Sequence, residues 1–291
     1  MAGPAPWSLP TPGKGGALAS LRRRLNGRHA LSVILIGAVL WSVLSADWTS
    51  GLIHGGGWAA LGDLVSGFAQ PDLSGETLGQ AAKAAWITVV YAVAGLSVAL
   101  IMAVPLALLA SGTLVRHRRA RLWGVSVSRT VLSLLRAVHE LVWAWLFVAA
   151  IGLSPFAAIF ALAIPYAGIL GRIYADFLVD VPEAPLRALR TGGAGESVVL
   201  VYGRLPSAVA DLASYTFYRF ECGLRSAAIM GFVGLSGLGF QIQLSLNDLN
   251  YERAATFLFV LFGLIALVEL WSTQLRRRLV LGVHRGQGVT S

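Results

Sequence analysis

Charged residues are scarce in this chain of 291 residues. Asp, Glu, Lys and Arg together make up 13% of it, whereas hydrophobic residues make up 56%. A soluble domain carries roughly 25% charged residues. The mean hydropathy is +0.70, and the apolar residues stand in long blocks that would leave large exposed patches in water. This composition excludes an ordinary soluble domain and indicates an all-α integral membrane protein. The single cysteine, Cys222, excludes an intrachain disulfide.

Motifs for catalysis and nucleotide binding are also missing. No Walker A sequence with its Gly-Lys-Ser/Thr phosphate cradle occurs, so we expect that this chain does not hydrolyse ATP itself. His139-Glu140 begins like a zinc-protease helix, but Trp143 stands where that motif has its second imidazole. The glycine-rich residues 234–239 lack the order and strand context of a dinucleotide fingerprint. We therefore predict no catalytic residues, no metal and no cofactor held by this chain.

The net charge of +9 comes from short basic clusters. Each cluster abuts an apolar block, at residues 22–28, 116–121 and 276–285. A nucleic-acid-binding protein would instead gather its basic residues on one face. Clusters beside apolar blocks are what the positive-inside rule produces in membrane proteins. We therefore expect the lipid bilayer, and no nucleic acid, as the partner of this chain.

The apolar blocks predict about six transmembrane helices, since a span needs about 20 mainly apolar residues. The expected spans are 31–46, 85–110, 125–151, 155–177, a fifth from 208 into the glycine-rich 231–239, and 254–275. Residues 58–68 form an amphipathic piece, and 226–253 leaves room for a re-entrant piece or an extra short helix. The predicted organisation is a disordered cytoplasmic tail (1–30), a first helix with an extracytoplasmic segment (31–78), a transmembrane domain (79–276) and a cytoplasmic tail (277–291).

The distribution of charge predicts the orientation in the membrane. Residues 47–82 are acidic and contain no Lys or Arg. Basic residues gather in the N-terminal tail, in 112–123, in 178–206 and in the C-terminal tail. Six spans with both termini in the cytoplasm satisfy the positive-inside rule at all of these segments.

Ionisable residues inside predicted spans are candidates for function, because burying them in lipid is costly. In the third span, the spacing i, i+3, i+4 and i+7 places four side chains on one helical face: Arg136, His139, Glu140 and Trp143. In the fifth span, three more share a face and Arg219 is turned about 100° away: Tyr218, Glu221 and Arg225. We predict that these eight residues line a substrate pathway.

A purely structural role for these charges is the alternative. Glu221 and Arg225 stand in the favourable order for an intrahelical pair, and such charges can also lock one helix to another. Arg136 and Arg219 lack an obvious acid at the same depth in the membrane, so we favour a polar pathway for them. Arginine suits an oxyanion because its planar fork donates two parallel hydrogen bonds.

Residues 182–206 carry the most specific motif. Arg187-Ala188-Leu189 is followed by three residues, Gly193, nine residues and Gly203-x-Leu205-Pro206. This spacing resembles the EAA loop of ABC importer permeases, written Glu-Ala-Ala, three residues, Gly, nine residues, Ile-x-Leu-Pro. Arg187 stands where the family has Glu, and Gly203 where it usually has Ile.

The resemblance implies that residues 178–206 fold into short coupling helices that dock on an ATPase subunit. Gly193 would permit the turn between them, and Leu205-Pro206 would end the segment before the next span. The ATPase-coupling residues implied in this way are Arg187, Ala188, Gly193, Leu205 and Pro206. The inverted charge at Arg187 suggests either an altered docking surface on the ATPase or a weakened subunit.

Four further stretches resemble the phosphonate branch of these permeases: residues 139–144, 214–221, 225–227 and 231–234. The resemblance implies a type I permease fold in the bacterial inner membrane and ATP-driven uptake of phosphonates, phosphite or hypophosphite. Implied partners are two ATP-binding subunits that hold ATP and Mg²⁺, an extracytoplasmic substrate-binding protein, and a second permease copy or paralogue.

Other readings stay open at this point. One alternative is a permease for a different small anion within the same class of importer. A passive channel or secondary transporter would use the same intramembrane charges but has no reason to carry an EAA-like loop. An intramembrane hydrolase using His139 and Glu140 would need a nucleophile or metal partner for which the sequence has no matching constellation.

Overall fold

The computed structural model describes residues 14–45, 57–115 and 117–287, with side chains described for 29–45, 61–115 and 117–278. This described part is helical and contains no strand, which confirms the all-α prediction. The chain divides into two compact units, Met1–Ala60 and Leu61–Ser291.

The first unit contains α1 (Lys14–Ser45). Its apolar part, His29–Ser45, covers the predicted first span except residue 46, which lies outside the described residues. The predicted disordered tail of residues 1–30 is wrong from residue 14 onward, because α1 begins there. The prolines of residues 1–30 all precede residue 14, and the rest of this segment is rich in Ala, Leu and Arg, which favour helix.

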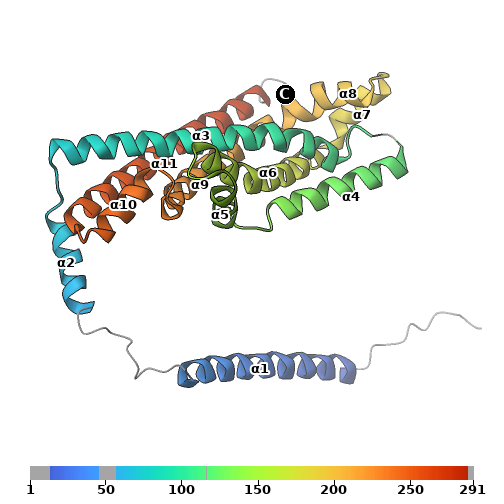
Figure 1. The fold of residues 1–291 in the computed structure, drawn as a ribbon. Helices are drawn as coiled ribbons and strands as arrows, with labels where there is room; N and C mark the ends of the chain where they lie inside the picture. Colours follow the sequence, from blue (N-terminus) through green and yellow to red (C-terminus); the bar gives the residue numbers. More distant parts are fainter. Residues whose placement is uncertain (1–13, 46–56, 116, 288–291) are drawn as a thin grey trace, which may run out of the picture. The chain divides into compact units, whose positions relative to one another are not determined.

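The second unit is a bundle of helices joined by short connections (Figure 1). The helix α2 (Gly57–Ala69) begins in the first unit and continues into the second. The other elements of the second unit are α3 (Gly75–Ser111), α4 (Arg118–Leu135), α5 (Glu140–Ile151), α6 (Pro155–Val179), α7 (Glu183–Thr191), α8 (Glu196–Val199), η1 (Leu200–Arg204), α9 (Leu205–Ile229), η2 (Met230–Val233), α10 (Leu238–Asn247) and α11 (Tyr251–Gln287).

The described residues supply four helical segments long and apolar enough to cross a membrane: Gly75–Ser111, Pro155–Val179, Glu196–Asn247 and Tyr251–Arg278. A fifth results if α4 and α5 together make one broken span. The expectation of about six spans thus stays a prediction, with the shorter apolar helix His29–Ser45 as the remaining candidate.

Small residues hold the centre of the bundle, where α3 packs along α6 (Figure 1). Ala99 and Ala103 of α3 and Ala163 and Ala167 of α6 are fully buried in one cluster. Small side chains let helix backbones approach closely, which is how membrane helices associate without a hydrophobic driving force. A Cβ on Gly168 of α6 would lie 2.7 Å from the carbonyl oxygen of Leu132 in α4.

The predicted third span is broken in the middle. Its two parts, α4 and α5, are bent by 79° between Leu135 and Glu140. The backbone N–H of Leu141 donates to Nδ1 of His139, which caps α5. Gly168 of α6 crosses at the same place, and a Cβ there would lie 2.9 Å from the Arg136 nitrogen. The prediction of one helical face is therefore wrong for this span, because no continuous helix joins its residues.

The helix of the predicted fifth span, α9 followed by η2, ends at Val233, inside the glycine-rich stretch as expected. After α9, the chain turns at Gly234 (φ +86°) and Gly237 (φ +141°) and forms α10. A Cβ on Gly239 would overlap the carbonyl of Ala228, so glycine is required where the two segments cross. Of the two alternatives for residues 226–253, the extra short helix is confirmed as α10. The candidate last span ends at Arg278, and α11 continues beyond it to Gln287, so the cytoplasmic tail from residue 277 stays a prediction.

Candidate functional site

The predicted coupling loop folds into two short helices, α7 and α8, separated by a turn at Gly193. Gly193 has a φ of +87°, a conformation that glycine adopts far more readily than other residues, as predicted for the turn. Leu186 and Val199 are fully buried and pack with Leu178 at the end of α6. The loop therefore has an apolar side that packs against the bundle and, apart from it, a group of charged side chains.

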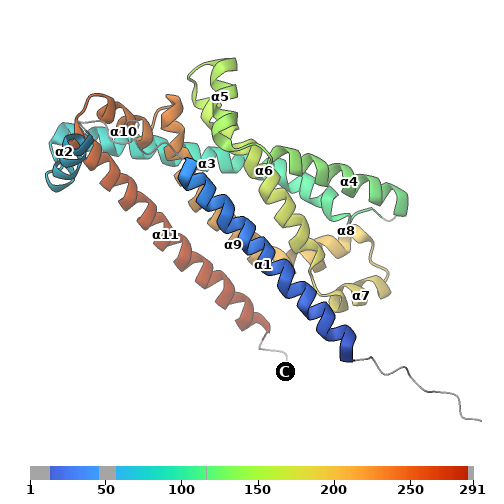
Figure 2. The same ribbon diagram turned by 90° about the horizontal axis from the view of Figure 1, so that it is seen from below.

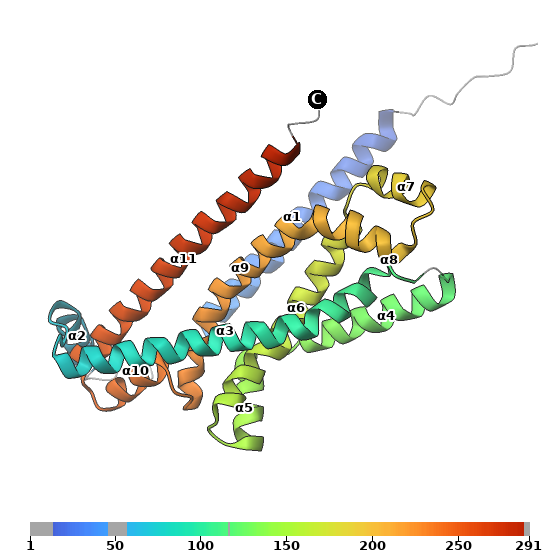
Figure 3. The same ribbon diagram turned by 90° about the horizontal axis from the view of Figure 1, so that it is seen from above.

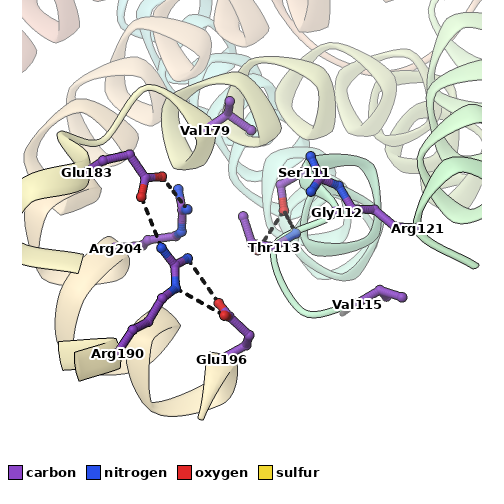
Figure 4. A pocket seen from close by; sticks show the side chains of 10 residues that line it. All are labelled: Ser111, Gly112, Thr113, Val115, Arg121, Val179, Glu183, Arg190, Glu196 and Arg204. Atoms are coloured by element: carbon purple, nitrogen blue, oxygen red, sulfur yellow. Dashed lines mark hydrogen bonds and ion pairs between the residues drawn. The ribbon is translucent and has the colours of Figure 1, made fainter. Parts of the chain in front are cut away.

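A chain of ion pairs stabilises the charged side of this loop (Figure 4). Arg190 donates to both carboxylate oxygens of Glu196, each at 3.1 Å, and to Glu183 at 3.0 Å. Arg204 donates to the other oxygen of Glu183 at 3.1 Å and to the Leu178 carbonyl at 2.7 Å. Together these bonds join α7, α8, η1 and the end of α6.

The electrostatics of this network favour the ionised carboxylate. The hydrogen bond from Arg190 and the charge of Arg204 hold the pKa of Glu183 below its ordinary value. Hydrogen bonds that Arg190 donates to Glu196 and Glu183 raise the pKa of Arg190. Sequence reasoning missed all four residues, although the acids that flank Arg190 were a visible signal in a basic loop.

The residues predicted to contact an ATPase lie on this loop or just after it. Arg187 and Ala188 are exposed on α7, and within the described residues the Arg187 side chain forms no hydrogen bond or ion pair. Leu205 and Pro206 are the first residues of α9 and are exposed. Their exposure leaves them free for a partner protein.

The prediction that Leu205-Pro206 ends the segment is wrong. α8 runs through η1 into α9 without interruption. The five residues of η1 form a π-turn in which the N–H of Leu205 donates to the carbonyl of Leu200. Pro206 has no N–H to donate to the helix, and it directly follows this π-turn while the helix continues past it. The coupling loop is thereby continuous with a long apolar helix.

A second polar cluster lies where α5, α6 and α9 meet. The hydroxyl of Ser226 donates to Glu140 at 2.6 Å and is 3.1 Å from the hydroxyl of Tyr166. Ser226 and Tyr166 are buried, with 8% and 3% exposure. Trp143 stacks on Phe147, and its indole nitrogen is buried without a hydrogen-bond partner among the described residues.

Arg219 of α9 lies among three tyrosines. Its guanidinium carbon is 5.1, 5.8 and 6.0 Å from the ring centroids of Tyr166, Tyr215 and Tyr218, within the range of cation–π attraction. It donates to the Tyr215 hydroxyl at 3.2 Å. Within the described residues it has no carboxylate partner, and its Nε is buried without an acceptor. The site therefore combines an uncompensated cation with phenol donors.

The other two charges of the fifth span pair with a different helix. Glu221 accepts from Arg276 of α11 at 2.7 Å, and Arg225 lies 3.7 Å from Glu269 of α11. The prediction of an intrahelical Glu221–Arg225 ion pair is therefore wrong. Both residues form ion pairs between helices instead, which was the structural alternative. Figures 2 and 3 show α9 running beside α11.

The structure thus brings together only part of the predicted pathway. Glu140, Trp143, Tyr218 and Arg219 lie around the junction of α5, α6 and α9. His139 is largely exposed, with Nε2 3.8 Å from Glu140. Arg136 is exposed at the end of α4, and its side chain forms no hydrogen bond or ion pair within the described residues. Tyr166 and Ser226 were not predicted as site residues, although Ser226 stands inside one of the stretches that resemble the phosphonate branch.

A bundle of long apolar helices, with a charged pair of short helices between two of them, defines a multi-pass transport permease. Residues 103–281 match the family of binding-protein-dependent transport system inner membrane components, and the chain belongs to this family. It is therefore an inner-membrane permease subunit and not an enzyme.

Relatives of this chain carry names from phosphorus transport. It is 30% identical over 251 residues to the phosphite transport system permease protein PtxC of Stutzerimonas stutzeri, covering 83% of this chain and 87% of the relative. It is 34% identical over 193 residues to the phosphate-import permease protein PhnE of Mycolicibacterium smegmatis, covering 66% and 36%. These relatives confirm the resemblance to phosphonate-type importer permeases.

Solved structures confirm the fold. The inward-facing MetNI methionine ABC transporter matches with a TM-score of 0.62 at 20% identity, covering 71% of this chain and 99% of the matched chain. An amino acid ABC transporter matches with a TM-score of 0.59 at 17% identity, covering 70% and 95%. The type I importer permease fold predicted from the sequence is thus the fold of this chain.

Proposed function

We propose that this chain is the permease subunit of an ATP-driven importer for phosphonates or related phosphorus oxyanions such as phosphite and hypophosphite. The observation that carries the proposal is its similarity, over 83% of its length, to a phosphite transport permease. An importer of the same class for another small anion is the alternative, and it shares the coupling machinery.

The chemistry around Arg219 supports an anionic substrate. A cation without a carboxylate partner is costly inside a membrane and is a functional candidate for that reason. The guanidinium is held by tyrosine rings rather than neutralised, so its charge stays available to an oxyanion. One guanidinium group with neighbouring tyrosine hydroxyls binds an anion weakly enough to release it, as transport requires. We therefore assign the first contact with substrate in the membrane to Arg219.

The charges that remain exposed support assembly with a second permease copy or paralogue. The side chains of Arg225 and Glu269 are 48% and 56% exposed, although both lie in apolar helices. Contact with lipid would be unfavourable for both. A second permease that covers them would remove that cost. Homodimeric and heterodimeric assembly both satisfy this argument.

Coupling to ATP would run through the loop of α7 and α8. Two ATP-binding subunits, holding ATP and Mg²⁺, would dock against exposed Arg187 and Ala188, and an extracytoplasmic binding protein would deliver the substrate. Since α8 continues into α9, movement of the loop would be passed to Arg219 along one helix. This arrangement suits a two-state rocking motion, with both termini of the permease in the cytoplasm.

ATPase activity of the reconstituted complex with its binding protein tests the proposal. We expect stimulation by at least one of methylphosphonate, 2-aminoethylphosphonate, phosphite and phosphate, and the strongest stimulant identifies the substrate. Sulfate serves as the control anion, since it has the same tetrahedral shape without phosphorus. Lack of stimulation by every phosphorus compound, with an active ATPase subunit present, would refute the substrate assignment and leave the importer class standing.

A further inference from the structure

A cavity of about 380 Å³ lies between the coupling loop and the connection from α3 to α4 (Figure 4). Arg190 and Arg204 line it from the loop side, and Ser111, Thr113 and Arg121 line it from the other side. Its volume falls in the range of small-molecule sites. The substrate pathway described above does not include it.

The lining of this cavity carries an excess of positive charge. Three arginines and two carboxylates line it, which leaves one positive charge. Both carboxylates are already engaged, Glu196 by Arg190, and Glu183 by Arg190 and Arg204. Arg121 has no carboxylate partner among the described residues, so its charge is uncompensated. A cavity of this kind attracts small anions.

Hydrogen-bond donors accompany that charge. The Arg204 side chain is only 9% exposed, and its Nε is buried without an acceptor among the described residues. The hydroxyl of Ser111 donates to the Leu108 carbonyl at 2.8 Å and lies 2.9 Å from the hydroxyl of Thr113, so these two hydroxyls form the polar wall of the cavity and the arginines supply its donors. Guanidinium groups bind phosphate-type oxyanions through two parallel hydrogen bonds.

We propose that this cavity is a regulatory site for a phosphate-type oxyanion on the cytoplasmic side of the permease. Its place on that side, and the identity of its ligand with the imported product, rest on the proposed function. α7 contacts α8 and η1, and α8 contacts η1, whereas neither helix has comparable contacts with α3 or α4, apart from Leu108 of α3, which packs against the apolar cluster of the loop. An anion held between Arg121 and the loop arginines therefore bridges elements that are otherwise loosely joined, restrains the loop and slows transport.

The same chemistry has two sources, a free phosphorus oxyanion and the phosphate of an anionic lipid headgroup. Proteoliposomes containing the assembled transporter distinguish them. Vesicles of phosphatidylcholine are loaded with ATP, with or without phosphite, and the initial rate of phosphite uptake is measured. A second set replaces part of the phosphatidylcholine with phosphatidylglycerol and contains no internal phosphite.

Arg121→Gln is the test variant and Arg119→Gln the matched control, since Arg119 is exposed on the same helix and does not line the cavity. Both variants should retain the wild-type rate in empty phosphatidylcholine vesicles. We expect internal phosphite to slow uptake severalfold in the wild type and in Arg119→Gln, and to have no effect in Arg121→Gln. The same pattern produced by phosphatidylglycerol instead would identify the lipid headgroup as the ligand. If neither agent has an effect that depends on Arg121, the site does not exist.

A binding measurement separates failure of this inference from failure of the transport proposal. If the wild type takes up no phosphite into empty vesicles, phosphite is not its substrate, and the cavity is tested by the melting temperature of the detergent-solubilised complex. Phosphite should then raise the melting temperature of the wild type and of Arg119→Gln more than that of Arg121→Gln, because a ligand bound only to the folded state stabilises it. Equal shifts in all three proteins would overturn the proposal.

Discussion

Ser226 of α9 donates a hydrogen bond of 2.6 Å to Glu140, the first residue of α5, across 86 positions of the chain. Glu140 directly follows the bend that divides α4 from α5. The bond therefore fastens the second half of the broken span to α9. Because α9 is also continuous with the coupling loop, one helix connects the loop to the polar cluster.

Removal of the Ser226 hydroxyl should destabilise this junction. Hydrogen bonds to charged groups contribute about 1.5–3 kcal/mol, so Ser226→Ala is expected to lower the free energy of unfolding by about 2 kcal/mol. Denaturant unfolding of the purified complex measures the change. Ser97→Ala is the control, since exposed Ser97 bonds only to the Val93 carbonyl of its own helix. Equal losses in the two variants would show that the bond to Glu140 contributes nothing specific.

Substitution of Arg219 should abolish transport without unfolding the protein. Arg219→Gln removes the charge that we assign to the substrate, and Arg219→Lys keeps a charge but loses the planar fork and its stacking on tyrosine. We expect uptake to fall more than tenfold in the first variant and less in the second. The double variant Arg225→Gln/Glu269→Gln removes a paired cation and its partner and should retain uptake. If uptake is lost only in the double variant, the roles of Arg219 and Arg225 are reversed.

The turn at Gly193 should be required for coupling. The left-handed backbone conformation costs about 1–2 kcal/mol for a residue with a Cβ. Gly193→Val should therefore distort the turn between α7 and α8. We expect ATP hydrolysis to continue while uptake falls. Gly192→Val is the matched control, because Gly192 has a φ of −73° that any residue adopts. Normal uptake by Gly193→Val would refute the placement of the coupling loop.

Acidification should loosen the coupling loop. The folded pKa of Glu183 lies below its ordinary value of 4.5, so its ion pairs stabilise the loop fully above 4.5 and are lost as the pH falls through the folded pKa. Hydrogen exchange of residues 183–199, corrected for intrinsic rates, should accelerate below pH 4.5 in the wild type. Glu183→Gln should respond less, whereas Glu76→Gln, at a distant helix, should respond like the wild type.

The fold could be predicted where local sequence determines it. Apolar length alone located α6 and most of α3. The turn at Gly193 followed from the resemblance and from the conformation that only glycine adopts easily. The short helix α10 was one of two alternatives, because glycines around residue 234 indicate a turn without fixing where the chain goes next.

The rest depends on contacts between segments far apart in the chain. Residues 125–151 read as one span because no proline or glycine stands at the break near Arg136; the close approach of Gly168 in α6 accompanies the bend. Glu221 pairs with Arg276, 55 positions away, instead of with Arg225 on its own helix. Helical spacing predicts only which residues are neighbours within one helix. Neither the break near Arg136 nor the pair between α9 and α11 could therefore be predicted from it.

ATP-dependent uptake is the most direct test of the central claim. Proteoliposomes containing this permease, its ATPase subunits and its binding protein are supplied with labelled phosphite, methylphosphonate or sulfate, with ATP or a non-hydrolysable analogue inside. The account predicts accumulation of at least one phosphorus oxyanion with ATP, none with the analogue, and no accumulation of sulfate. Accumulation that is equal with ATP and with the analogue would contradict it, since the chain would then be a passive or secondary transporter.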